Sequence, residues 1–156
     1  FTRTMMWLRR DHPVLRRRRF FTGDAGHGGE SELGEIEWLT PAGESMTDQD
    51  WTTWYARAMM VFLNGEAIAE PDERGQRIVD DSFLVLINAS DEDITFTLPG
   101  EGYATTWKVA LDTAPAVDGD SDPVLAADDT VVVEARSMLF LIDAPESAAT
   151  TERHQR

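Results

Sequence analysis

The spacing of apolar residues changes along the chain, from a helical period near the start to a period of two further on. Phe1, Met5 and Leu8 recur at i, i+4 and i+7, which predicts a helix over residues 1–11. Pro13 should end this helix, because its ring disfavours helical geometry in the preceding residue. Later segments alternate apolar and polar side chains, which is typical of short strands. The pattern therefore predicts one helix, a connector and one β domain.

The apolar runs of the later segments predict an antiparallel β-sandwich. They lie around Ile36 and Trp38 and over residues 58–63, 83–87, 94–98, 107–111, 131–133 and 137–142, the last two being two strands or one bent strand. The run 83–87 is apolar throughout, as expected of a central strand that is covered on both faces. Asn64-Gly65 predicts a tight hairpin, and Thr47 followed by Asp50 predicts the start of a helical turn.

These elements divide the chain into four expected segments. Residues 1–22 would be the end of a helix with its exit segment, 23–57 a connector with a short strand and a helical turn, 58–143 the β-sandwich, and 144–156 a disordered tail. The chain begins with Phe1 and its first residues already follow a helical pattern, which indicates a cut sequence.

Charge is distributed unevenly. Residues 1–22 carry seven Arg against Asp11, a net charge of +6. Because the whole chain has a net charge of −15, the remaining residues together carry −21. Such an acidic surface repels nucleic acid and anionic lipid, and we expect neither nucleic acid nor a membrane as a partner. The run Arg16–Arg19 is expected to pair with the acidic body or with another domain. The absence of cysteine excludes disulfides and makes a reducing cytoplasm the expected compartment.

The aromatic group Trp51, Trp54 and Tyr55 is the candidate binding site. On a helical turn these residues lie at i, i+3 and i+4 and share a face. Indole rings can stack on the apolar faces of glucose units, so the group is a candidate for binding a neutral polysaccharide. The alternative is that the same face packs on the sandwich or on another domain.

Other candidate chemistry is weaker. Residues 118–122, with Asp129 at the twelfth place, resemble the opening of a calcium loop, but Pro123 occupies the sixth place, where the turn needs glycine. A solvated acidic loop fits better. Of the three histidines, His12 should cap or pack at a helix end, and His27 and His154 lie in a glycine loop and in the tail. We expect no catalytic residue, no metal site and no cofactor in this chain.

A series of motifs runs in order over residues 3–143. It comprises Trp7-Leu8-Arg9-Arg10-Asp11-His12-Pro13, Arg17-Arg18-Arg19-Phe20-Phe21, Ile36-Glu37-Trp38-Leu39-x-Pro41-x-Gly43, Met46-Thr47-x-x-Asp50-Trp51, Phe62-Leu63-Asn64-Gly65, Asp72-Glu73-Arg74-Gly75, Asp80-Asp81-Ser82-Phe83-Leu84, Leu86-x-Asn88-Ala89, Phe96-x-Leu98-Pro99, Trp107-x-Val109-x-Leu111-Asp112-Thr113 and Arg136-Ser137. This series resembles the bacterial glycogen debranching enzymes of the GlgX/TreX type, isoamylase-like members of the α-amylase superfamily.

The resemblance implies a parent enzyme that hydrolyses α-1,6 branch linkages in glycogen or limit dextrin. Its catalytic carboxylates lie on a (β/α)8 barrel that precedes this segment, so no catalytic role passes to any residue of this chain. The chain would supply the last helix of the barrel and the C-terminal β-sandwich, and its partners would be the barrel in the same polypeptide and, through it, the glucan. The alternative from another class is an independent carbohydrate-binding β-sandwich.

Overall fold

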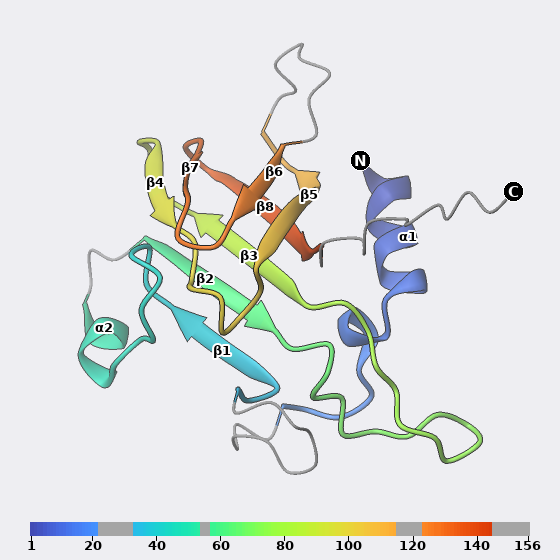
Figure 1. Ribbon diagram of the computed structural model, residues 1–156. Coiled ribbons are helices and arrows are strands. Elements are labelled where there is room, and N and C mark those ends of the chain that lie inside the picture. The colour runs from blue at the N-terminus through green and yellow to red at the C-terminus, as the bar shows by residue number, and fades with distance from the viewer. Residues whose placement is uncertain (22–32, 54–56, 115–122, 145–156) are drawn as a thin grey trace, which may run out of the picture.

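The computed structural model describes residues 1–21, 33–53, 57–114 and 123–144. Its elements are α1 (Thr2–Asp11), the 3-10 turn η1 (Pro13–Arg16), β1 (Ile36–Leu39), α2 (Asp48–Thr52), β2 (Ala58–Leu63), β3 (Phe83–Asn88), β4 (Ile94–Thr97), β5 (Thr106–Asp112), β6 (Val124–Ala126), β7 (Thr130–Val133) and β8 (Ser137–Asp143). The predicted fold class is confirmed: the chain is mainly antiparallel β, and a helix precedes it (Figure 1).

The strands form two sheets. Six are ordered β1-β2-β3-β8-β5-β6, and β4 pairs with β7 in a second sheet. Directly opposed residues of antiparallel strands point to the same face, so Met60, Leu86 and Leu139 line one row of the face that meets the second sheet. Phe96 and Val133 of the second sheet complete this core. Full burial of each large apolar side chain contributes roughly 1.5–3 kcal/mol.

The sheet order resolves one alternative that the sequence left open. Residues 131–133 and 137–142 belong to two separate strands, β7 and β8, which lie in different sheets. Arg136 lies between them with a φ of 57°, which allows the sharp change of direction. Strand β6 was not predicted, because its short apolar segment carries no alternation that distinguishes it from a loop.

The tight hairpin predicted at Asn64-Gly65 is wrong. The strand that pairs with β2 begins only at Phe83, so residues 64–82 form a long connection. Gly65 is needed for a different reason: a Cβ there would lie 2.1 Å from the carbonyl oxygen of Asp80 and 2.4 Å from that of Asp81. The two ends of the connection are joined by a hydrogen bond from Asp80 N to Gly65 O, 3.1 Å long.

The predicted first helix is confirmed as α1, and it lies at one end of the six-stranded sheet, whereas α2 lies beside the opposite end (Figure 1). The turn η1 follows at Pro13. A small second core forms here from Val14, Ile68 and Phe83, with Leu8 packed against it. It sits on the face of the sheet opposite the main core, because Phe83 alternates with Leu84 of the main core along β3.

Candidate functional site

The first candidate surface is built where β1 reverses direction. Gly43, with a φ of 84°, allows the turn, and its N–H donates to Thr40 O at 3.0 Å. The returning chain runs beside β1, where Met46 N donates to Trp38 O at 2.8 Å. The chain then enters α2 at Thr47, so this helix begins close to Trp38.

The start of α2 is fixed by the capping box predicted from sequence. Thr47 N donates to Asp50 Oδ2 at 2.7 Å, and Asp50 N donates to Thr47 Oγ1 at 3.4 Å. Hydrogen bonds from the Thr47 side chain and then from its backbone lower the pKa of Asp50, since they stabilise its carboxylate. The cap orients the first turn of α2 and thereby Trp51.

Trp51 meets Trp38 of β1 in an edge-to-face contact, with ring centroids 5.3 Å apart and planes at 74°. Both rings remain open to solvent, at 50% for Trp51 and 39% for Trp38. Trp54 and Tyr55 lie outside the described residues. The described helix ends at Thr52, and Thr53 has an extended backbone.

Trp38 was not among the residues singled out from sequence. Its place on a strand was visible in the alternating pattern around it, but its contact with Trp51 depends on the return of the chain after β1. The signal that could have found it is the turn at residues 41–43 followed directly by the capping box. Together these two features bring α2 back beside the end of β1.

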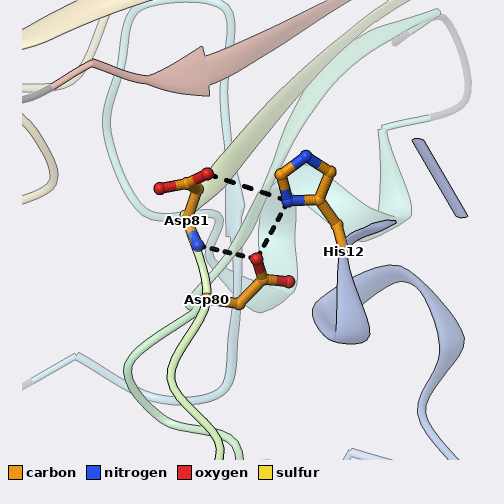
Figure 2. A group of neighbouring side chains, drawn as sticks. All are labelled: His12, Asp80 and Asp81. Atoms are coloured by element: carbon orange, nitrogen blue, oxygen red, sulfur yellow. Dashed lines mark hydrogen bonds and ion pairs between the residues drawn. The ribbon is translucent and has the colours of Figure 1, made fainter. Parts of the chain in front are cut away.

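The second candidate cluster holds α1 against the sandwich (Figure 2). His12 Nδ1 lies 2.9 Å from Asp80 Oδ1, and Val14 N donates to Asp80 Oδ2 at 2.9 Å. Asp81 N donates to Asp80 Oδ1 at 2.9 Å, and the His12 ring lies edge-on to Phe83 with centroids 4.9 Å apart. The Asp80 side chain is 7% exposed, so these hydrogen bonds satisfy a buried carboxylate.

This cluster brings together a His and two Asp side chains whose ligand atoms lie within 4.8 Å of one another, a spacing at which a metal ion could be considered. Both oxygens of Asp80 already accept hydrogen bonds, however, and the Nδ1 of His12 faces a carboxylate as a donor rather than offering its lone pair outward. The arrangement fixes the helix end, and we assign it a structural role.

A shallow acidic depression of about 420 Å³ adjoins the cluster. Burial raises the pKa of Asp143 there, and the neighbouring charges of Asp81 and Glu66 raise it further. The Asp143 side chain would therefore lose its proton less readily than an exposed carboxyl group.

The arginine run is divided between two environments. Arg17 forms an ion pair with Glu35 at 3.1 Å, the two side chains being 7% and 10% exposed, and it donates to Ala67 O at 2.9 Å. Its guanidinium also lies 5.0 Å from the centre of the Phe21 ring. Arg16, Arg18 and Arg19 are exposed. The expected pairing with the acidic body is thus observed for Arg17.

The other candidates from the sequence are two histidines and the possible calcium loop. His27, His154 and residues 118–122 of the possible calcium loop lie outside the described residues. Asp129 accepts a hydrogen bond from Ala126 N at 2.8 Å and so closes the turn between β6 and β7. Among the described helices, none is long and apolar enough to cross a membrane.

Comparison with known proteins agrees with this fold. The family described as "Isoamylase, C-terminal" matches residues 35–145, which include every described strand. Proteins described as "Glycogen operon protein GlgX homolog" from Mycobacterium bovis and Mycobacterium tuberculosis are each 50% identical over 141 residues, covering 90% of this chain and 19% of the relative. The chain thus spans about a fifth of the length of these curated relatives. The chain belongs to the isoamylase C-terminal family.

Proposed function

We propose that this chain is the C-terminal accessory domain of a cytoplasmic glycogen debranching enzyme. The parent would be a glycoside hydrolase that cleaves α-1,6 branch linkages in glycogen or limit dextrin. Residues 1–22 would end the last barrel helix and leave the barrel, and residues 58–143 would form most of the accessory sandwich. The family match and the names of the relatives support this proposal, because the relatives carry about four-fifths of their length outside the matched region.

The structural observation that carries the proposal is that α1 is attached to the sandwich and yet remains exposed. The helix is tied to the sandwich through the His12–Asp80 contact and the small second core, yet none of its residues is buried. Phe1, Met6 and Trp7 are 71%, 68% and 58% exposed. Each such side chain forgoes about 1.5–3 kcal/mol of burial. A helix that is held in place on a sandwich with exposed apolar side chains around it is suited to packing against a further domain.

In this proposal the catalytic carboxylates belong to the barrel, and this chain shapes the edge of the substrate cleft. The Trp38–Trp51 pair would lie near the edge of the substrate cleft. A neutral glucan is compatible with the acidic surface, because no phosphate repulsion opposes its approach. No cofactor is required, since glycoside hydrolysis uses two carboxyl groups and water.

The reaction is tested with the full-length protein on two substrates. We expect release of reducing ends from a branched limit dextrin and almost none from linear amylose. Loss of branch points is followed by iodine staining. Rapid cleavage of amylose, with the branch points of the limit dextrin left intact, would contradict the debranching assignment.

The Trp38–Trp51 pair favours a second candidate, an independent carbohydrate-binding module. Two exposed indole rings on a capped helix and a strand edge could stack on glucose units. This candidate predicts that the isolated chain is retarded in a native gel containing glycogen. Trp51→Ala should abolish the retardation, whereas Trp7→Ala, at an equally exposed indole on α1, should preserve it. Equal migration with and without glycogen would eliminate this candidate.

A further inference from the structure

A depression of about 410 Å³ lies where the connection between β2 and β3 passes η1 (Figure 1). It is distinct from the acidic depression beside Asp143, which is lined by other residues. The apolar part of its wall consists of four side chains, Pro13, Ile68, Pro71 and Ile78. Its volume falls within the range that sites for small molecules occupy. The depression therefore has room for a small organic ligand.

Three arginine side chains line this depression without an acidic partner. They are Arg16 and Arg18, which flank Arg17, and Arg74 of the connection. Arg17 forms its ion pair with Glu35, whereas in the described part of the chain no carboxylate lies within ion-pair distance of the other three. A guanidinium group can donate two parallel hydrogen bonds to a phosphate group. Three such groups are thus available at one place in a chain whose net charge is −15.

Arg74 is held in position by a tight turn at the tip of the connection. Asp72 Oδ1 accepts hydrogen bonds from Arg74 N and Gln76 N, both 2.8 Å long. Gly75 has a φ of 77°, and its N–H donates to Asp72 O at 3.0 Å. The carboxylate of Asp72 therefore serves the turn. The backbone of Arg74 is fixed before any ligand arrives, which lowers the entropic cost of binding.

Glu70 adds a buried acceptor to the same wall. Its Oε1 is shielded from solvent and has no hydrogen-bond partner among the residues that the structure describes. Buried polar atoms normally have a partner, and a carboxylate oxygen can be satisfied only by a donor such as a hydroxyl group. Glu73 also lines the depression, but it is exposed, so solvent and salt screen its charge. The wall thus combines guanidinium donors with one acceptor that needs a hydroxyl group.

We propose that this depression binds a sugar phosphate. The three arginines bind the phosphate group, Glu70 accepts a hydrogen bond from a hydroxyl group, and the apolar wall contacts the C–H groups of the sugar ring. A neutral sugar would leave the guanidinium groups without a charged partner, and inorganic phosphate would leave the apolar wall in water. This inference goes beyond the proposed function, since it gives the accessory domain a ligand of its own.

Isothermal titration calorimetry of the full-length protein with glucose 6-phosphate tests the site. We expect saturable binding, and a dissociation constant about tenfold higher for Arg74→Gln, because this variant loses a charged contact with the phosphate group. Arg57→Gln is the matched control, since Arg57 is exposed, lies outside the depression and already pairs with Asp91 at 3.6 Å. It should bind as the unaltered protein does. The proposal would be overturned by the absence of saturable binding, or by equal weakening in the two variants.

Two further ligands separate the sugar from the phosphate group. Glucose and inorganic phosphate should each bind about tenfold more weakly than glucose 6-phosphate, because each makes only part of the contacts. Glu70→Ala should reduce the preference for glucose 6-phosphate over inorganic phosphate, since the acceptor for the hydroxyl group is lost. Equal affinities of the unaltered protein for these two ligands would overturn the assignment to a sugar phosphate. Binding is measured without turnover, so the result does not depend on the debranching activity.

Discussion

His12 and Asp80 show how two residues far apart in sequence fix the end of a helix. Pro13 forces His12 out of helical geometry, to a φ of −109° and a ψ of 104°, and so turns its ring towards the loop that precedes β3. Asp80 then accepts from the imidazole and from the free backbone N–H of Val14. The carboxylate thus satisfies the first backbone donor of η1, the Val14 N–H, which has no partner within the turn.

Loss of the Asp80 carboxylate should therefore destabilise the junction. Asp80→Ala leaves Val14 N–H without its acceptor in a partly buried place, and we expect a decrease of about 1–3 kcal/mol in the free energy of unfolding. Urea denaturation measures it, and hydrogen exchange should show faster exchange at Val14. Asp81→Ala is the matched control: its side chain is 52% exposed, and the expected change is within about 0.5 kcal/mol. Equal losses in both variants would show that the contact at Asp80 is not the cause.

Asp143 makes stability depend on pH in the opposite sense to a salt-bridged carboxylate. Its pKa is raised in the folded chain by burial and by neighbouring acids, so the folded state favours the protonated form. The stabilisation from this group is present below the unfolded pKa, near 3.9, and is lost as pH rises through the folded pKa. Asp143→Asn should therefore raise the melting temperature at pH 7 and give no gain below pH of about 3.9.

Thermal unfolding at the two pH values checks this prediction. Glu101→Gln, an exposed carboxyl-to-amide change, controls for the loss of one negative charge. A gain of the same size in both variants at pH 7 would assign the effect to net charge and contradict a local origin at Asp143.

At the scale of single residues, sequence predicts well where the chemistry is local. The capping box of Thr47 and Asp50 was predicted because both partners lie within one turn. The role of His12 at a helix end was predicted in kind, but Asp80 as its partner was not, because 68 positions separate the two residues. The same holds for Trp38 and Trp51, whose contact depends on a turn between them.

Among the elements, the connection between β2 and β3 shows why a strong local signal can mislead. Asn-Gly favours a two-residue hairpin when both residues adopt positive φ. Here neither residue is among those with positive φ, and Gly65 is required because the returning backbone of Asp80 and Asp81 passes against it. The dipeptide thus marks a close approach of two backbone segments rather than a tight turn.

Gly65→Ala should be far more costly than an alanine substitution at an open glycine. The new methyl group would lie 2.1 Å from a backbone carbonyl oxygen, which cannot move without shifting the start of β3. We expect a loss of about 1–3 kcal/mol or more in the free energy of unfolding. Gly102→Ala, where nothing lies within 4 Å of the added atom, should change it by less than about 0.5 kcal/mol. A similar effect at both positions, measured by chemical denaturation, would contradict this explanation.

At the scale of the molecule, the apolar run of residues 83–87 predicted a strand covered on both faces. The structure covers one face with the second sheet, and on the other face Phe83 and Val85 are buried whereas Ile87 is partly exposed. Sequence patterns reveal that a strand is apolar on both sides, but not which body covers each side. The sandwich class followed from the alternating runs, whereas the division of strands between two sheets depended on long-range pairing.

The most direct test of the central claim compares debranching by the isolated chain with debranching by the full-length protein. Both are assayed on branched limit dextrin, after circular dichroism has confirmed β structure in the isolated chain. An accessory domain predicts hydrolysis of branch linkages by the full-length protein and none above background by residues 1–156. Measurable turnover by the isolated chain would contradict the claim that catalysis resides elsewhere in the polypeptide.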